Sequence, residues 1–247
     1  MLEYRIERFY SLAKGKKSKL PFTLNSKTSK ELIRGVDFSF ERILSFYNIT
    51  FDTLLLVGAN DAAELKSTVY KQFKYICAIE PNIDLNHDLK SNLSNSPRFE
   101  IFNFAAGEVP EISNLYLSSN NGQSSSLLKP LSHISRAPQV KFTGVREVPV
   151  KRIDSVFDNL SCPKVWVVDV QGFELNALKG AGDLLKCVEI IYCEVNREEV
   201  YEKCTQYKDL DDYLDNFGLH RVLIRWWGSW GDALYVRKSA SYSRKLK

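Results

Sequence analysis

A carboxylate and a glycine stand at the ends of two apolar segments, at a spacing that suggests a nucleotide site. Glu80 closes the segment "YICAIE", and Pro81 then stops the strand. Gly58 ends the segment "TLLLVG" 22 positions earlier, close to the spacing of about 20 residues between a glycine turn and a ribose-binding acid. A carboxylate can accept hydrogen bonds from both vicinal ribose hydroxyls. These residues predict a cofactor turn at Gly58, Ala59 and Asn60 with Glu80 on the ribose; a solvated turn carboxylate is the alternative for Glu80.

A second group of polar residues could face a cation or take up a proton. Asp169 and Gln171 lie in "VVDVQGFE", and Glu194 and Asn196 close the apolar segment "IIYCEVN". A carboxylate inside such a segment is costly unless a cationic ligand or a proton compensates for its burial. Asp169 is therefore the first candidate base and Glu194 the second. Two other interpretations stay open: a helix N-cap for Asp169, and a Mg²⁺ site built from the oxygens of Asp169, Glu194 and Asn196.

The surrounding segments predict the elements that would bring these residues together. Strands are expected at Thr53–Val57, Tyr75–Glu80, Phe99–Ala105, Val165–Val170, Glu189–Val195, Arg221–Trp226 and Ala233–Arg237. Helices are expected at Asp61–Phe73, Asp84–Leu93, Asp154–Asn159, Glu174–Lys186 and Arg197–Asn216. Nearly continuous apolar strands such as "VWVVDV" are typical of a parallel sheet covered on both faces. The carboxyl ends of such strands form the ligand-binding edge, so the polar residues named above should meet there.

The last two strands indicate how the sheet is closed. They are separated by the short link "WGSWGD", which is too short for a parallel crossover and fits an antiparallel hairpin. The sequence therefore predicts an α/β fold: a Rossmann-like, seven-stranded, mostly parallel sheet with an antiparallel C-terminal strand and helices on both faces. This is the arrangement of class I methyltransferases and not that of a standard NAD-binding fold.

Residues 108–150 interrupt the alternation of strands and helices. They are rich in Ser and Asn and include strand-like stretches, which predicts a hairpin or flap beside the sheet. Such insertions often shape a substrate pocket. Ser125 and Ser126 could hydrogen-bond an acceptor there, and His133 could reach over the site as a third catalytic candidate. A solvated polar flap with an idle histidine is the alternative.

Two further features could contact flat rings. The segment "NFAAGE" begins at Asn103 and contains Ala105, and its small residues would let an adenine lie against the backbone. Trp226, Trp227 and Trp230 cluster at the closing hairpin, where an aromatic face could stack on a sugar or another planar acceptor. Trp227 is the substrate candidate, and a core position is the alternative.

Charge and composition bound the class of protein. The net charge of +4 combines +6 in residues 1–30, +5 in residues 237–247 and a negative remainder. The basic ends could touch phosphate or an anionic membrane surface, or be solvated only. Domain boundaries are expected at 1–50 (a basic extension plus a helix), 51–238 (the catalytic domain) and 239–247 (a basic tail).

The sequence also bears on where the protein is located and on the redox state of its cysteines. The chain lacks an apolar run of about 18 residues, and its N-terminus is too charged for a signal peptide. We therefore expect a cytoplasmic protein without a membrane span. The five cysteines lack the spacing of a metal or disulfide framework, which predicts reduced thiols.

Short motifs between Thr53 and Lys238 follow a recognisable order. They are "VGAN", "IEP", "NFAAGE", "SSSL", "VPVKRID", "DVQGFE", "LKGA", "CEVN" and "WGDALYVRK". In this order the chain resembles the FkbM-type methyltransferases, a family that uses S-adenosylmethionine and mostly methylates hydroxyls, often on sugars. The resemblance implies that Gly58 and Asn60 approach the methionine part of the cofactor, Glu80 the ribose and Ala105 the adenine, with Asp169 at the reaction centre. The full set of expected cofactor contacts is Gly58, Ala59, Asn60, Glu80, Pro81, Asn103, Ala105, Asp169 and Gln171.

Two positions depart from the family pattern. Leu56 stands where members usually have Asp, and Ala62 where they usually have a second glycine. Asp61 or Glu64 could supply the missing charge. The predicted function is O-methylation of a sugar, glycan or other small molecule, with Mg²⁺ not expected. Two alternatives remain: a methyltransferase-shaped scaffold with weakened cofactor binding, and an RNA ribose 2′-O-methyltransferase that uses the basic ends.

Overall fold

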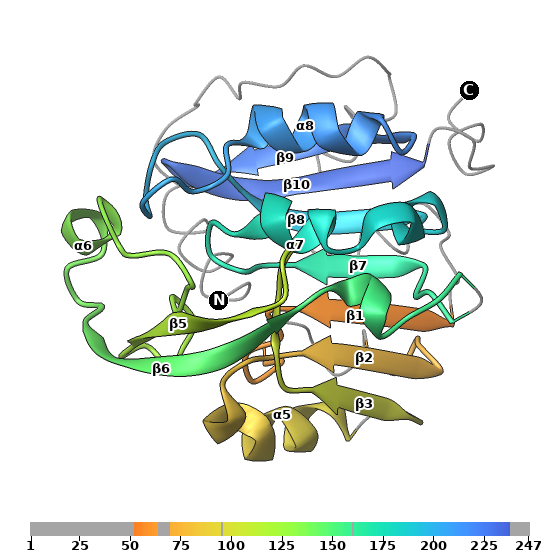
Figure 1. The fold of residues 1–247 in the computed structure, drawn as a ribbon, viewed down its shortest axis with the longest axis horizontal. Coiled ribbons are helices and arrows are strands. Elements are labelled where there is room, and N and C mark those ends of the chain that lie inside the picture. Colours follow the sequence, from red (N-terminus) through yellow and green to blue (C-terminus); the bar gives the residue numbers. More distant parts are fainter. Residues whose placement is uncertain (1–51, 64–69, 95, 160, 238–247) are drawn as a thin grey trace, which may run out of the picture.

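The computed structural model describes residues 52–63, 70–94, 96–159 and 161–237, and its centre is a seven-stranded sheet (Figure 1). The strands run in the order β3-β2-β1-β7-β8-β10-β9. They are β1 (Thr53–Val57), β2 (Tyr75–Ile79), β3 (Phe99–Phe102), β7 (Val165–Val168), β8 (Ile190–Asn196), β9 (Leu219–Trp226) and β10 (Trp230–Arg237). β10 is antiparallel to both of its neighbours, and the other pairs are parallel. The predicted mostly parallel sheet with an antiparallel C-terminal strand is confirmed.

Helices cover both faces of this sheet, as predicted. The described helices are α5 (Asn86–Leu93), α6 (His133–Arg136), α7 (Glu174–Lys179) and α8 (Tyr207–Asp215), with the 3-10 helices η1 (Ile83–Leu85), η2 (Ile153–Ser155) and η3 (Gly182–Lys186). Successive residues of a strand point to opposite faces. Leu55 of β1 accordingly shares an apolar cluster with Leu210 of α8, whereas Leu54 shares another with Leu89 of α5.

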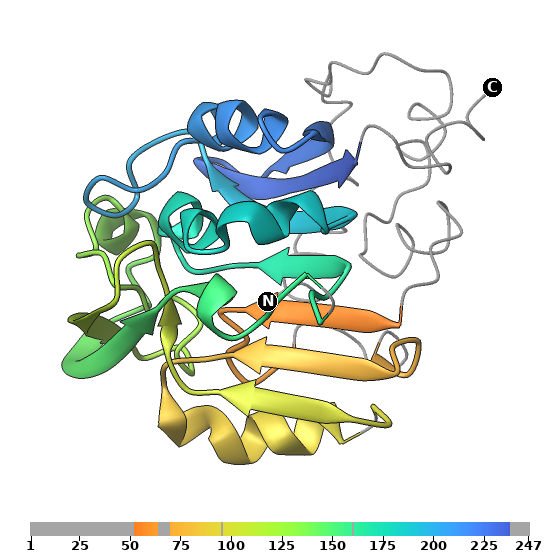
Figure 2. The ribbon, with the colours of Figure 1, turned by 45° about the vertical axis from the view of Figure 1, so that its right-hand side comes forward.

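A hairpin stands beyond the carboxyl ends of the parallel strands. β5 (Glu111–Ser118) and β6 (Phe142–Lys151) pair antiparallel, and the short strand β4 (Ala105–Ala106) pairs with β6 to complete a three-stranded sheet. Leu115 and Val148 of the hairpin are buried in one apolar cluster. Figures 1 and 2 both show this sheet beside the arrowheads of β1, β2 and β7. The segment predicted as a flap therefore lies at the edge where ligands of such sheets bind.

Residues 197–206 correct the helix predicted at Arg197–Asn216, because only its second half is helical, as α8. The backbone of the first half bonds to the flap instead. The carbonyl of Val200 accepts the N–H groups of Leu131 at 3.0 Å and His133 at 3.1 Å. A helix would need this carbonyl for its own i to i+4 bond. Docking of the flap therefore replaces the first turns of the predicted helix.

Two other predicted helices are shorter than expected. The helix predicted at Asp154–Asn159 is only η2, because Asp158 and Ser161 cap each other's N–H groups at 3.0 and 2.8 Å and form a turn. The helix predicted at Glu174–Lys186 is divided into α7 and η3. α7 ends at Lys179 with Gly180 as its C-cap, and η3 begins at Gly182, whose left-handed φ of +50° is incompatible with one continuous α-helix.

The third predicted strand, Phe99–Ala105, also divides. β3 ends at Phe102, and Ala105 pairs with Val150 in the flap sheet. Between them, the side chain of Asn103 donates to the carbonyl of Glu80 at 3.0 Å. The chain therefore passes from one sheet to the other immediately beside Glu80.

Several predictions fall outside the described residues: the helix and basic extension within 1–50, the tail at 239–247 and residues 64–69 of the helix predicted at Asp61–Phe73. Among the helices that the structure describes, none combines the length and the apolar composition required to cross a bilayer. The cytoplasmic location stays a prediction.

Candidate active site

Gly58 brings the ends of three strands together. Its φ is +77°, and a Cβ atom at this position would lie 2.0 Å from the backbone oxygen of Asp169. The N–H groups of Gly58 and Ala59 both donate to the carbonyl of Ile79 at 3.0 Å, and the N–H of Asp169 donates to Val57 at 2.9 Å. The turn after β1 therefore requires glycine for close approach to β7, independently of any ligand.

Glu80 lies at the end of β2 with its carboxylate held by backbone donors. The N–H groups of Asn60 and Asn82 each donate to one of its oxygens at 2.8 Å. Only 7% of Glu80 is exposed, and burial raises its pKa from 4.5 to about 7, against the lowering effect of the two hydrogen bonds. Asn103 supports the same turn through the Glu80 carbonyl and pairs with the side-chain amide of Asn86.

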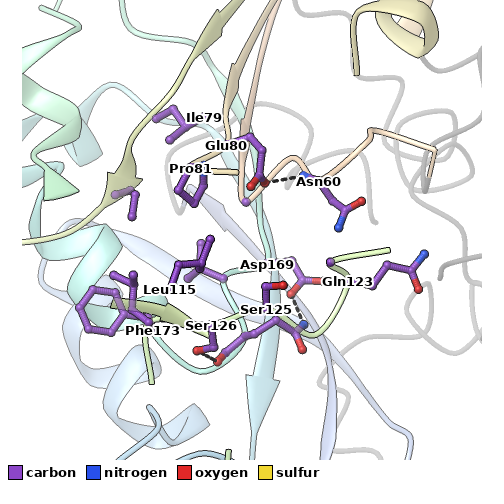
Figure 3. Close-up of a pocket in the computed structure, with 17 residues that line it drawn as sticks. Asn60, Ile79, Glu80, Pro81, Leu115, Gln123, Ser125, Ser126, Asp169 and Phe173 are labelled. Atoms are coloured by element: carbon purple, nitrogen blue, oxygen red, sulfur yellow. Dashed lines mark hydrogen bonds between the residues drawn. The ribbon is translucent and has the colours of Figure 1, made fainter. Parts of the chain in front are cut away.

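A pocket opens between the strand ends and the flap, with about 610 Å³ of space including the part open to solvent. It is lined by Gly58, Asn60, Ile79, Glu80, Pro81, Ala105, Ala106, Leu115, Gly122, Gln123, Ser125, Ser126, Leu127, Asp169, Val170, Gln171 and Phe173. Figure 3 shows Glu80 and Asn60 on one side of it and Asp169 and Ser125 on the other.

The lining combines negative charge with apolar surface. Its acidic side chains are Glu80 and Asp169, and no Lys, Arg or His is among the described residues that line it. Leu115 and Leu127 of the flap face this space together with Ala105. An acidic, partly apolar pocket is suited to a ligand that carries positive charge beside a flat apolar group.

Gln171 connects the two candidate bases. Its amide nitrogen lies 2.5 Å from an oxygen of Asp169 and 3.3 Å from an oxygen of Glu194. Its backbone carbonyl accepts the hydroxyl of Ser126 from the flap at 2.8 Å. Gln171 is 6% exposed and has a φ of +54°. The structure therefore brings Asp169, Gln171 and Glu194 together, as the sequence predicted.

Glu194 and Asn196 lie behind the pocket lining. Glu194 is 4% exposed and is paired across the strands with Asp232 of β10. Asn196 is fully buried, and neither atom of its side-chain amide has a hydrogen-bond partner among the described residues. Neither Glu194 nor Asn196 is among the residues that line the pocket, and Glu194 contacts the lining residue Gln171.

His133 and Trp227 are also outside the pocket lining. His133 has Nε2 3.1 Å from the hydroxyl of Ser124, and its ring packs against Phe142 and Tyr201. Burial lowers the pKa of His133, so its imidazole is neutral at neutral pH. Trp227 donates to Asp232 at 3.1 Å and stacks under the guanidinium of Arg225. Neither side chain touches the lining, and their catalytic and substrate roles stay predictions.

The two departures from the family pattern have different surroundings. Leu56 is 4% exposed and packs in an apolar cluster with Ala78, away from the pocket lining. Ala62 has a φ of +56° and is 2% exposed. Asp61 accepts the side-chain amide of Asn121 from the flap at 2.9 Å. The other candidate for the missing charge, Glu64, lies outside the described residues.

Sequence reasoning missed the flap residues that complete the pocket: Leu115, Gly122, Gln123 and Leu127. It also missed Phe173, although this residue lies inside the "DVQGFE" motif and its position alone could have indicated it. Tyr201, which contacts Gln171, carries no sequence signal because its place depends on how residues 197–206 dock. Within the described ranges, no group of three His, Cys, Asp or Glu side chains is arranged to hold a metal ion.

Comparisons with known proteins find methyltransferases. Residues 57–220 match the model of the Methyltransferase FkbM domain. A 2-O-methyltransferase, NoeI of Sinorhizobium fredii (strain NBRC 101917 / NGR234), is 25% identical over 203 residues, which cover 78% of this chain and 82% of that protein.

Two solved structures are also similar to the chain. A TehB-like SAM-dependent methyltransferase of Corynebacterium glutamicum ATCC 13032 Kitasato has a TM-score of 0.39 at 10% identity, covering 96% of this chain and 98% of that one. The methyltransferase domain of bacterial CtHen1-CN has a TM-score of 0.43 at 9% identity, covering 87% and 100%.

Proposed function

The chain belongs to the FkbM methyltransferase family, and from that premise we propose that it methylates a hydroxyl group of a sugar, glycan or other small molecule. It is an S-adenosylmethionine-dependent methyltransferase. The observation that carries the site assignment is the pair of acidic side chains, Glu80 and Asp169, on opposite sides of one pocket. The hydroxyl acceptor is supported by the relative named as a 2-O-methyltransferase.

The residues of the pocket fit the cofactor by their chemistry. Glu80 would accept the ribose hydroxyls, and the flap residues Leu115 and Leu127 would cover the adenine against Ala105. Gly58 and Asn60 would adjoin the methionine part. The negative charge of the lining suits a sulfonium cation better than it suits the pyrophosphate of a dinucleotide.

The chain's own contribution to the reaction is alignment and removal of a proton. When bound, S-adenosylmethionine would supply an electrophilic methyl group, so that the acceptor oxygen forms the new C–O bond as the S–CH₃ bond breaks and neutral S-adenosylhomocysteine leaves. A neutral hydroxyl is a weak nucleophile, and a carboxylate within hydrogen-bond reach can accept its proton. We assign this role to Asp169 because it lines the pocket, whereas Glu194 is not among the lining residues and contacts one of them, Gln171. Ser125 and Ser126 of the flap would orient the acceptor.

The test is titration calorimetry with S-adenosylmethionine and S-adenosylhomocysteine, followed by a screen of free monosaccharides for methylated product by mass spectrometry. Glu80→Gln keeps an acceptor for a backbone N–H but loses the charge. We expect its affinity for both ligands to fall by about 10-fold to 100-fold, the value of a hydrogen bond to a charged group. Glu100→Gln on β3 is the matched control, since Glu100 bonds Tyr75 and does not line the pocket.

The outcomes separate the alternatives. Binding to the intact protein that Glu80→Gln weakens, and Glu100→Gln does not, would support the cofactor site and justify the acceptor screen. A folded protein that binds neither ligand would contradict the site assignment and favour a scaffold role. Methylation of RNA with a steep salt dependence, and not of sugars, would replace the acceptor class.

A further inference from the structure

Tyr201 places a buried hydroxyl beside Gln171, whose side-chain amide bonds Asp169. The residue lies in the segment between β8 and α8, belongs to none of the motifs singled out in the sequence, and is 1% exposed. Its hydroxyl is 3.0 Å from the amide oxygen of Gln171 and 2.9 Å from the backbone oxygen of Ser124 in the flap. Tyr201 also forms a β-bridge with Pro130. It therefore joins the flap to the pocket residues through one side chain.

The hydrogen bonds around Gln171 allow one orientation of its amide. The amide nitrogen faces oxygens of Asp169 and Glu194, which as carboxylates only accept hydrogen bonds. The amide oxygen therefore faces the hydroxyl of Tyr201, whose single proton is shared between this oxygen and the backbone carbonyl of Ser124. The reversed amide would place its oxygen 2.5 Å from a carboxylate oxygen and would direct its NH₂ group at the tyrosine. The two carboxylates thus set the orientation of the amide, and the hydroxyl of Tyr201 restrains the amide oxygen in that orientation.

The backbone at Gln171 indicates that this placement is costly to achieve. Its φ of +54° lies in the left-handed region, which is unfavourable for a non-glycine residue. The next residue, Gly172, also has a positive φ, of +99°. Strained backbone of this kind persists where the surroundings fix it, often at functional sites. Here the surroundings include Ser126 on the backbone carbonyl of Gln171 and Tyr201 on its side chain.

We propose that Tyr201 is a positioning residue, which acts through the amide of Gln171 to hold the carboxylate of Asp169 toward the transferred methyl group. The inference rests on the proposed function, in which Asp169 lies at the reaction centre. Tyr201 lies outside the sequence motifs quoted above, and it acts through the amide oxygen of Gln171.

The experiment compares two ligands that differ by one methyl group and its positive charge. S-adenosylmethionine carries a sulfonium cation and S-adenosylhomocysteine a neutral thioether, so the ratio of their affinities measures how well a carboxylate faces the sulfur. Tyr201→Phe removes the hydroxyl and keeps the ring that packs on His133. Tyr235→Phe is the matched control: Tyr235 is also fully buried, and its hydroxyl donates to Asp211 of α8 at 2.9 Å.

We expect Tyr201→Phe to lower the preference for S-adenosylmethionine by about 3-fold to 10-fold, the value of one hydrogen bond, while binding of S-adenosylhomocysteine stays near wild type. Tyr235→Phe should leave the ratio unchanged at a similar loss of thermal stability. In an Asp169→Asn background, Tyr201→Phe should change the ratio no further, because the two residues act on the same charge.

Three results would overturn the proposal, and they are distinguishable. Equal losses for both ligands would make Tyr201 merely structural. An unchanged ratio in folded Tyr201→Phe, or a full effect in the Asp169→Asn background, would show that it does not act through Asp169. If the wild-type protein bound neither ligand, the proposed function itself would fail, and the positioning role would fail with it.

Discussion

Two small residues of the turn after β1 both have positive φ, but only one of them must be glycine. A Cβ atom at Gly58 would collide with the backbone oxygen of Asp169 at 2.0 Å. Ala62 already carries a buried methyl group at a φ of +56°. Its left-handed strain of about 1–2 kcal/mol is offset by about 0.8 kcal/mol from burying that methyl. A further gain of about 0.4–1 kcal/mol comes from the lower entropy of alanine in the unfolded chain.

We therefore expect Ala62→Gly to change the free energy of unfolding by less than about 1 kcal/mol, since these contributions nearly cancel. Affinity for S-adenosylmethionine should hold, because Ala62 does not line the pocket. Gly58→Ala should be strongly destabilising and serves as the contrasting variant. Urea denaturation and calorimetry measure both properties. A large gain in affinity for Ala62→Gly would instead identify the alanine as a defect of the cofactor turn.

At the scale of elements, the flap is bonded to the turns that carry the predicted cofactor contacts. Arg146 of β6 donates to the side chains of Asn82 at 2.7 Å and Asp84 at 2.6 Å, just after β2. Asn82 in turn donates its N–H to Glu80. Asn121 joins the flap to Asp61 after β1. Movement of the flap and order at Glu80 should therefore be coupled.

Replacing Arg146 with Ala should loosen this contact with little effect on global stability, since the ion pair with Asp84 is partly exposed. We expect faster hydrogen–deuterium exchange in the flap and a loss of affinity for S-adenosylhomocysteine of about 3-fold to 10-fold. Arg136→Ala is the control, because Arg136 pairs with Glu198 outside the pocket lining. Equal exchange and affinity in the two variants would refute the coupling.

How far the sequence predicts this site depends on which contacts are local. Glu80 and Asp169 could be placed because each ends an apolar run, and parallel strands bring their carboxyl ends to one edge. Leu115 and Tyr201 could not be placed, because Leu115 reaches the pocket and Tyr201 bonds both the flap and Gln171 only when the flap docks. Residues 197–206 have the composition of a helix, yet their backbone bonds to the flap. Tertiary contacts thus overrode local propensity there.

At the scale of the whole molecule, two buried acids give the stability a distinctive dependence on pH. Burial raises the pKa of Glu174 from 4.5 to about 8 and that of Glu80 to about 7. Each folded acid binds a proton that the unfolded chain has lost above pH 4.5, so stability falls as pH rises until the folded group ionises. His133 acts in the opposite direction, but only below pH 6.5, because burial lowers its pKa.

Between pH 7 and pH 8.5 the effect of Glu174 is isolated by comparing the wild type with Glu174→Gln, because Glu80 and the buried cysteines, whose pKa is also raised, contribute equally to both proteins. We expect the free energy of unfolding of the wild-type protein to fall by about 1 kcal/mol more than that of Glu174→Gln over this interval. Glu174→Gln imitates the protonated acid and keeps an acceptor for the N–H of Gly172, which lies 2.8 Å from one carboxyl oxygen of Glu174. Its stability should match the wild type near pH 5.5 and fall less steeply above pH 7. Urea denaturation at four pH values measures both slopes. Parallel slopes would mean that Glu174 is ionised in the folded protein and adds a second negative charge beside Asp169.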